Sequence, residues 1–83
     1  MNHFVYILRC SDGTLYTGYS TDVTKRVARH NAGRGAKYTR ARRPVVLAFS
    51  WGFKTVSEAM AMEREIKRRP RAYKMYLCTL LAL

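Results

Sequence analysis

Five polar side chains have the types that phosphodiester hydrolysis needs, at spacings that a small fold could bring together. They are Tyr6, Tyr16, Arg26, His30 and Glu63. A carboxylate can bind a divalent cation, an arginine can neutralise a phosphoryl group, and tyrosine or histidine can exchange protons. Each residue alone also has a structural explanation, because strand tyrosines usually pack and an arginine stem often lies along apolar surface. The combination therefore indicates a candidate phosphodiesterase site.

Glu63 is the member of this set whose position most needs an explanation. Projected at about 100° per residue, its predicted helix turns one apolar face to the core. That face holds Val56, Ala59, Met62 and Ile66. Glu63 falls inside the same arc, and a carboxylate there is costly unless it is paired or holds a metal. Two explanations stay open: a structural ion pair with Arg26 or Lys67, and a metal ligand.

A β-hairpin is predicted to position the two tyrosines. Two segments rich in β-branched and aromatic residues form its strands, residues 4–8 and 15–19. A three-residue loop that ends at Gly13, in the left-handed conformation, pairs Leu8 with Tyr16 and Tyr6 with Gly18. Both tyrosines then share one face, whereas a two-residue loop would place them on opposite faces. We predict the three-residue form, with open space at Gly18 opposite Tyr6.

The helix after the hairpin is predicted to run from about Asp22 to about Asn31. Val23 and Val27 form its apolar stripe, beside Arg26 and His30, and a glycine at position 33 can end it.

Capping and periodicity signals define the rest of the chain. Thr55 and Glu58 form a capping box that begins a helix, and Pro70 stops it. The remaining predicted elements are a strand over residues 45–49 continuing toward 51 or 53, a helix over 55–69 and a final short helix over 71–81. This order predicts an α/β (α+β) fold, with a small three-stranded antiparallel or mixed sheet flanked by helices. We expect one domain over residues 1–83, with its core at about 3–75.

The strong positive charge favours a polyanionic partner. Sixteen Lys and Arg face five Asp and Glu, a formal net charge of +11, which attracts nucleic acid through its phosphates. We expect the basic segment 33–44 to hold backbone phosphates rather than to serve only as a solvated connection. The residues expected to contact nucleic acid are Arg34, Lys37, Tyr38, Arg40, Arg42, Arg43 and Lys67. No membrane partner is expected, because the apolar run over residues 77–83 is too short to span a bilayer.

The two cysteines do not indicate a metal site. Cys10 and Cys78 lie far apart and lack the paired spacing of a zinc finger. The first residues also lack the form of a secretory signal. We therefore expect reduced cysteines that fill the core of a cytoplasmic protein.

In this order and spacing, the motifs resemble those of the GIY-YIG nucleases. The family's Gly-Ile-Tyr motif corresponds to Val5-Tyr6-Ile7, and its Tyr-Ile-Gly motif to Tyr16-Thr17-Gly18. Arg26 lies ten residues after the second tyrosine, where the family has its essential arginine, and His30 lies one helical turn later. The family's Glu-Ala-x-x-x-Glu motif appears as Glu58-Ala59-Met60-Ala61-Met62-Glu63.

The resemblance covers about residues 3–75, and it extends to the smallest members of the family. Residues 30–39 look especially like the small stand-alone bacterial YhbQ-like proteins, and also like the catalytic subunit of the eukaryotic endonuclease that cleaves branched DNA. Two positions depart from the pattern. Val5 replaces the glycine of the first motif, and Tyr19 stands where excision-repair nucleases of the superfamily have a lysine.

By resemblance, the protein is a Mg²⁺-dependent or Mn²⁺-dependent endonuclease acting on nucleic acid, with DNA the expected substrate and DNA repair or processing the expected process. The family's pattern implies that Glu63 binds the metal and that Arg26 neutralises the phosphoryl oxygens. One of Tyr6 and Tyr16 takes a proton from the attacking water while the other positions it, and His30 orients that tyrosine or the water.

Two other readings compete with a free-standing enzyme. The first is a non-catalytic nucleic-acid-binding module that retains the nuclease-like residues as packing. The second is a protein-interaction subunit whose apolar end, residues 80–83, docks on a partner that supplies specificity.

Overall fold

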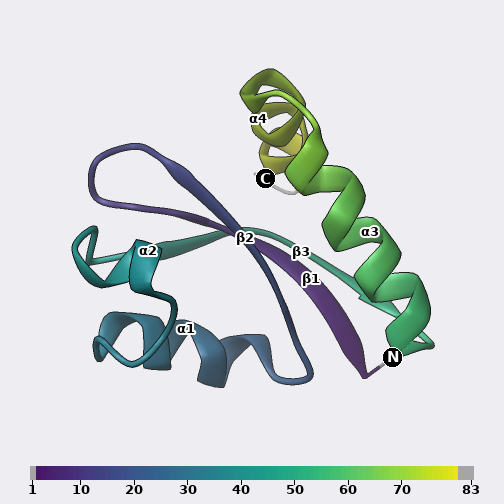
Figure 1. Ribbon diagram of the computed structural model, residues 1–83, viewed down its shortest axis with the longest axis horizontal. Coiled ribbons are helices and arrows are strands. Elements are labelled where there is room, and N and C mark those ends of the chain that lie inside the picture. The colour runs from purple at the N-terminus through teal and green to yellow at the C-terminus, as the bar shows by residue number, and fades with distance from the viewer. Residues whose placement is uncertain (1, 81–83) are drawn as a thin grey trace.

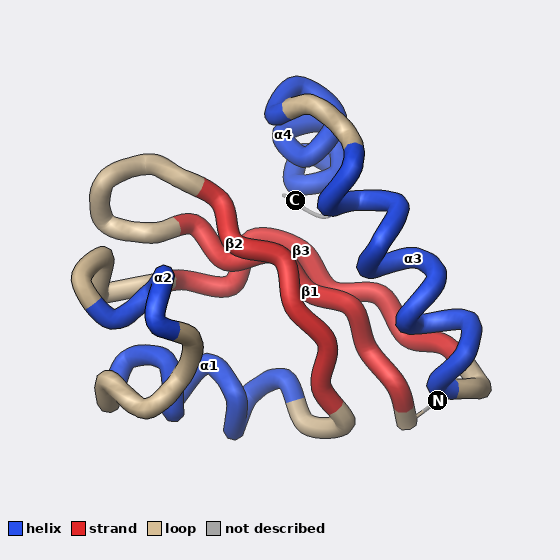
Figure 2. The backbone as a smooth tube through the Cα atoms, in the orientation of Figure 1, coloured by secondary structure: helices blue, strands red, loops and turns tan. Residues whose placement is uncertain are grey.

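The computed structural model describes residues 2–80, which form a three-stranded antiparallel sheet with helices on both faces (Figure 1). The elements are β1 (His3–Arg9), β2 (Leu15–Ser20), α1 (Val23–Asn31), α2 (Lys37–Arg40), β3 (Val46–Phe53), α3 (Val56–Arg68) and α4 (Arg71–Leu80). The strand order is β2-β1-β3. Helices α1 and α2 cover one face, and α3 and α4 cover the other (Figures 1 and 2). The predicted fold class is confirmed, and the sheet is antiparallel throughout.

The hairpin has the predicted register. Leu8 pairs with Tyr16 and Tyr6 pairs with Gly18. Gly13 has a φ of 84°, which a side chain disfavours, and its amide donates to the carbonyl of Cys10 at 3.0 Å. Both tyrosines therefore lie on the face of the sheet that α1 covers.

The central strand β1 is buried on both faces, which explains its unbroken apolar run. Toward α3 and α4, the core contains Val5, Ile7, Phe49, Ala59, Ile66, Leu77 and Cys78. Toward α1, it contains Tyr6, Leu8, Cys10 and Val45, with Tyr16, Val23 and Val27 packed against them. Both cysteines are free and buried, as predicted.

Helix α1 has a defined signal at each end. The side chain of Asp22 accepts from the amide of Lys25 at 3.0 Å and caps the first turn. At the other end Gly33 has a φ of 79°, and the amide of Arg34 donates to the carbonyl of Arg29 at 2.9 Å. This pattern is a Schellman motif, in which a left-handed residue satisfies the last carbonyls of the helix.

The segment between α1 and β3 departs from the prediction of a plain loop, because it contains the short helix α2. Asn31 fixes the end of the segment, since its side-chain amide donates to the carbonyl of Val45 at 3.0 Å and accepts from the amide of Val45 at 2.7 Å. The segment is therefore tied to both α1 and the sheet.

Helix α3 begins with the predicted capping box of Thr55 and Glu58. Ala59 and Ile66 are fully buried, as expected, but Val56 is 48% exposed, so its predicted place on the core face is wrong. Val56 occupies the first helical position, directly after the turn from β3, where no other element covers it. Helix α4 runs to Leu80, so residue 81 of its predicted range lies outside the described residues. No helix within residues 2–80 is long and apolar enough to cross a membrane.

Candidate active site

The polar residues singled out in the sequence converge on Tyr6. Its hydroxyl lies 3.0 Å from Nε2 of His30. Burial raises the pKa of Tyr6 to about 12, the nearby Tyr16 and Glu63 add to the rise, and the positive charge of Arg26 opposes it. The fold thus brings all five residues into one neighbourhood, from β1, β2, α1 and α3.

Gly18 makes room for Tyr6 on the neighbouring strand. A Cβ atom at Gly18 would lie 2.5 Å from Oη of Tyr6 and 2.6 Å from Cζ. The space predicted opposite Tyr6 is thus filled by the phenol itself, which is 1% exposed. The glycine of the second motif has a steric role, because no side chain fits between the phenol and β2.

His30 contacts Tyr6 and is closed off from solvent. Its ring is 1% exposed, with Nε2 near Tyr6 and Nδ1 at 2.7 Å from Oγ1 of Thr39. Burial, and then the charge of Arg26, lower the pKa of His30 below its usual value. The imidazole is therefore neutral at neutral pH, and it holds the phenol in place.

Thr39 is a site neighbour that sequence reasoning missed. It is fully buried and belongs to α2, in the segment predicted to hold backbone phosphates. A single threonine between basic residues shows no periodicity that would mark it as buried. Thr39 is buried because α2 packs over the ring of His30.

Arg26 presents an exposed guanidinium beside the tyrosines. It lies on α1 one turn before His30, and its side chain has no hydrogen bond or ion pair with any residue from 2 to 80. Its planar, permanently charged fork is thus available for a phosphate. The ion pair with Glu63 that the sequence left open does not form.

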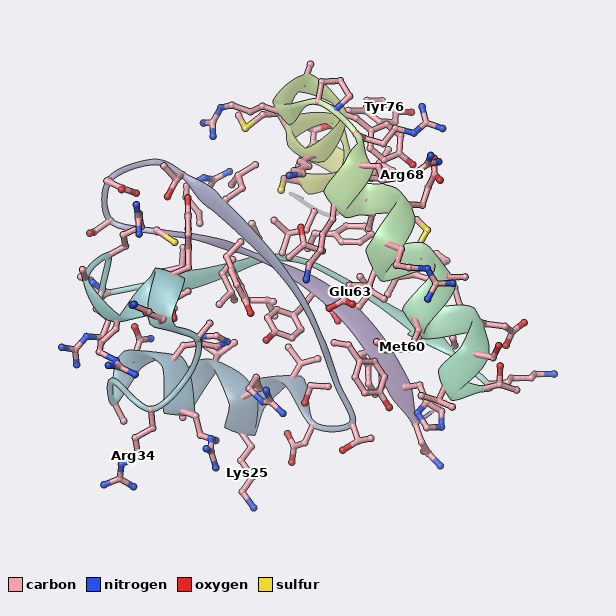
Figure 3. All side chains as sticks on the ribbon, viewed as in Figure 1. Lys25, Arg34, Met60, Glu63, Arg68 and Tyr76 are labelled. Carbon is pink, nitrogen blue, oxygen red and sulfur yellow. The ribbon has the colours of Figure 1, made fainter. Side chains whose placement is uncertain are left out.

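Glu63 lies on the side of α3 that faces the sheet, as Figure 3 shows. Its side chain is 14% exposed, and its charged contact is Nζ of Lys67 at 3.6 Å, one turn along the helix. Lys67 is half exposed, and an ion pair of this kind contributes at most about 1 kcal/mol. This contact does not account for a carboxylate placed against the sheet.

The donor set around Glu63 suits a cation that needs few protein ligands. Within residues 2–80, no three His, Cys, Asp or Glu side chains gather into a cluster that could hold a metal ion. Zinc and calcium sites require such clusters, whereas Mg²⁺ usually binds through one or two carboxylates, with water and substrate phosphates completing its coordination. Glu63 is compatible with the second arrangement.

Tyr16 is held from its outer side by a stack of side chains. Its ring centroid is 5.3 Å from that of His30 and 6.0 Å from that of Tyr38. The guanidinium of Arg42 lies 3.9 Å from the centroid of Tyr38, and its Nε is 3.1 Å from Oδ2 of Asp12. Tyr38 and Arg42 therefore extend this cluster of side chains outward from Tyr16 toward Asp12.

Some basic side chains of the segment bind other groups of the protein, and others have no such partner. In addition to Arg42, Arg43 is engaged, because its Nε donates to the carbonyl of Arg40 at 2.8 Å and its Nη1 to that of Asn31 at 3.4 Å. The residues with exposed side chains that have no ion-pair partner within residues 2–80 are Arg34, Lys37 and Arg40. Figure 3 shows Arg34 extending away from the body of the molecule. The free charges of the segment are thus fewer than the sequence suggests.

Comparison with known proteins gives one consistent answer. The family model described as the GIY-YIG catalytic domain matches residues 2–76. A UPF0213 protein of Halobacterium salinarum is 60% identical over 72 residues, covering 87% of this chain and 94% of the relative. A UPF0213 protein of Staphylococcus aureus is 55% identical over 76 residues, covering 92% and 93%.

Solved structures agree with this result. The solution NMR structure of the UPF0213 protein BH0048 from Bacillus halodurans is 51% identical with a TM-score of 0.63, covering 98% of this chain and 86% of that one. The solution NMR structure of EF2693 from E. faecalis is 42% identical with a TM-score of 0.65, covering 100% and 90%. The resemblance inferred from the motifs is confirmed, and the chain belongs to the GIY-YIG family of nuclease domains.

Proposed function

We propose that the protein is a metal-dependent endonuclease that hydrolyses phosphodiester bonds in nucleic acid, with DNA as its substrate. The observation that supports this proposal best is the common neighbourhood of Tyr6, Tyr16, Arg26 and Glu63. It joins an unpaired guanidinium, a carboxylate with one weak partner and two phenols. A hydrophobic core could pack without placing these polar side chains next to one another.

Glu63 is the residue that would hold the cation, Mg²⁺ or Mn²⁺. When bound there, the ion would supply positive charge to the scissile phosphate and stabilise the leaving oxygen. Arg26 binds the phosphoryl oxygens from the side of α1 and neutralises charge that grows in the transition state. The two charges come from helices on opposite faces of the sheet, Arg26 from α1 and Glu63 from α3.

The tyrosines have different surroundings, which supports different roles. Tyr6 is buried, and a phenol whose pKa is about 12 keeps its proton at neutral pH. It therefore fits the role of positioning the reacting groups through a hydrogen bond. Tyr16 is partly exposed and fits direct contact with the attacking water.

The free charges of the basic segment would hold the nucleic-acid backbone next to this site. Arg34, Lys37 and Arg40 are exposed in α2 and in the segment just before it. Helix α2 contacts the site through Thr39, which lies against His30, and Tyr38, which stacks on Tyr16. The three basic side chains read charge and backbone shape rather than sequence. We place this activity in cytoplasmic DNA repair or processing, with a protein partner adding selectivity.

A cleavage assay on labelled duplex, single-stranded and branched DNA tests the proposal, with Mg²⁺ or Mn²⁺ against EDTA. Glu63→Ala should abolish metal-dependent cutting and leave DNA affinity nearly unchanged. Glu65→Ala is the matched control, because Glu65 lies on the same helix and pairs with Arg68 and Arg69 at 2.6 Å. If the wild-type protein binds DNA tightly and in a salt-sensitive way but never cuts it, the protein is a nucleic-acid-binding module and not a nuclease.

A further inference from the structure

A surface hollow lies between the end of α1 and the segment that leads from α2 to β3. Its volume is about 480 Å³, and the residues that line it are Asn31, Arg40, Ala41, Arg43 and Pro44. A hollow of this size can hold a phosphate group together with the sugar attached to it. Two of its five lining residues are arginines, so the ligand it suits is an anion.

The guanidinium of Arg43 is held in place without being neutralised. Its Nε donates to the carbonyl of Arg40 at 2.8 Å and its Nη1 to that of Asn31 at 3.4 Å. A guanidinium has five N–H groups, so these bonds leave one on Nη1 and both on Nη2. The remaining groups have no hydrogen-bond partner within residues 2–80, and the residue is exposed. Because both acceptors are carbonyls, the positive charge of Arg43 is not cancelled.

The backbone fixes the orientation of this guanidinium. A Cβ atom at Gly33 would lie 2.9 Å from Nη1 of Arg43 and 3.3 Å from Cζ, so the guanidinium rests against that glycine. The end of the segment is also fixed, since the side-chain amide of Asn31 bonds both the amide and the carbonyl of Val45. A donor group that is already held in place loses little conformational entropy when it binds a ligand.

Arg40 supplies a second positive charge to the hollow. It is exposed, and its side chain has no ion pair or hydrogen bond within residues 2–80. No Asp or Glu of that range lines the hollow. Two guanidiniums without a carboxylate favour an anion, and the planar fork of a guanidinium matches the oxygens of a phosphate.

We propose that this hollow is a subsite for a phosphate group of the nucleic acid other than the one at the scissile bond. Arg43 binds its oxygens through Nη1 and Nη2, and Arg40 turns onto the same group. The proposal rests on the proposed function, because it takes nucleic acid as the substrate. Asn31 directly follows His30, and Arg40 directly follows Thr39, whose Oγ1 lies 2.7 Å from Nδ1 of His30. A phosphate held there would therefore set the position of the strand relative to the candidate active site.

Amide NMR spectra of the ¹⁵N-labelled protein, titrated with inorganic phosphate at low salt, test the subsite directly. The signals of Asn31, Ala41 and Arg43 should shift and reach saturation. Arg43→Lys keeps the charge but loses the fork, and it should weaken phosphate binding roughly tenfold. Arg64→Lys, the same change at an exposed position of α3, should leave the affinity unchanged. Unmoved signals at the hollow, or wild-type affinity in a folded Arg43→Lys protein, would overturn the proposal.

A second pair of variants keeps the test decisive if Arg43→Lys does not fold. Ala41 is exposed and lines the hollow, and replacing it leaves both arginines in place. Ala41→Glu should abolish phosphate binding, because its carboxylate competes for the guanidiniums. Ala41→Gln has nearly the same size without the charge and should retain binding. Phosphate binding that survives in Ala41→Glu would contradict the proposal.

Duplex DNA distinguishes an internal phosphate from a terminal one. If the subsite takes an internal phosphate, Arg43→Lys should lose affinity for duplexes with hydroxyl ends. If it takes a terminal phosphate, the loss should appear only on duplexes with a 5′-phosphate or 3′-phosphate. Unchanged affinity for all of these duplexes would refute the subsite. None of these measurements requires cleavage, so a protein that never cuts but binds phosphate through Arg43 retains the subsite and loses the nuclease function.

Discussion

The phenol of Tyr6 lies over the backbone of Gly18 so closely that a Cβ atom on that glycine would be 2.5 Å from Oη. The two residues are paired across β1 and β2, and each comes from one of the two motifs that define the family. Their spacing shows that the motifs form one structural unit, in which the second provides the space that the first occupies.

Gly18→Ala should therefore destabilise the fold by about 1–3 kcal/mol, because the added methyl group forces the ring of Tyr6 from its position. Cleavage should fall with it. A double-mutant cycle with Tyr6→Ala isolates the cause, since Gly18→Ala should cost little once the ring is absent. Chemical denaturation measures all four proteins. An equal cost in both backgrounds would show that the methyl group meets something other than the phenol.

Salt dependence should identify the charges that hold nucleic acid. The double variant Arg34→Gln, Arg40→Gln should lower the slope of log affinity against log salt by about two for duplex DNA, because two phosphate contacts are lost. The charge-matched control is Lys25→Gln, Arg64→Gln, on exposed faces of α1 and α3. Equal slopes for the two double variants would show that net charge, and not this segment, controls binding.

Arg42 should behave differently from its free neighbours. Its contacts with Tyr38 and Asp12 tie the basic segment to the hairpin. Arg42→Gln should lower the free energy of unfolding by around 1 kcal/mol, with Lys37→Gln as a control that keeps wild-type stability. Thermal unfolding of the three proteins is the measurement, and a stability of Arg42→Gln equal to wild type would show that its contacts with Tyr38 and Asp12 do not stabilise the fold.

Stability should fall as the medium becomes mildly acidic, because of His30. Its pKa in the folded state lies below the usual value of about 6.5. The unfolded chain therefore takes up the proton first, so the contribution is complete above pH 6.5 and is lost as the pH falls toward the folded pKa. Unfolding measured from pH 7.5 to 5 should show this slope. It should flatten in His30→Gln and persist in His3→Gln, and a wild-type slope in His30→Gln would contradict the assignment.

Local signals were enough to predict most of the framework. Gly13 fixed the loop length, and the register of Tyr6 and Tyr16 followed from it. The capping box at Thr55 and the stop at Pro70 set the ends of α3. These features depend on residues close together in the chain, where conformational preference and hydrogen bonding act directly.

The contacts that complete the site depend on residues far apart in sequence. Thr39 is buried in contact with His30, nine residues earlier in the chain. Arg42 forms an ion pair with Asp12, thirty residues earlier, at 3.1 Å. Neither contact leaves a periodic pattern. The four-residue helix α2 is also too short for helical spacing to show, since it spans little more than one turn.

Because β1 is buried on both faces, some of its residues are under selection for folding and others for activity. Val5 and Ile7 face α3 and α4, whereas Tyr6 faces α1 and the candidate site. Substitutions at the first two positions should reduce the amount of protein that accumulates in a cell. Conservative changes at Tyr6 should spare abundance and reduce function. Within β1, Tyr6 should thus be the position at which abundance and activity separate, whereas Val5, Ile7 and the equally buried Leu8 are constrained by folding.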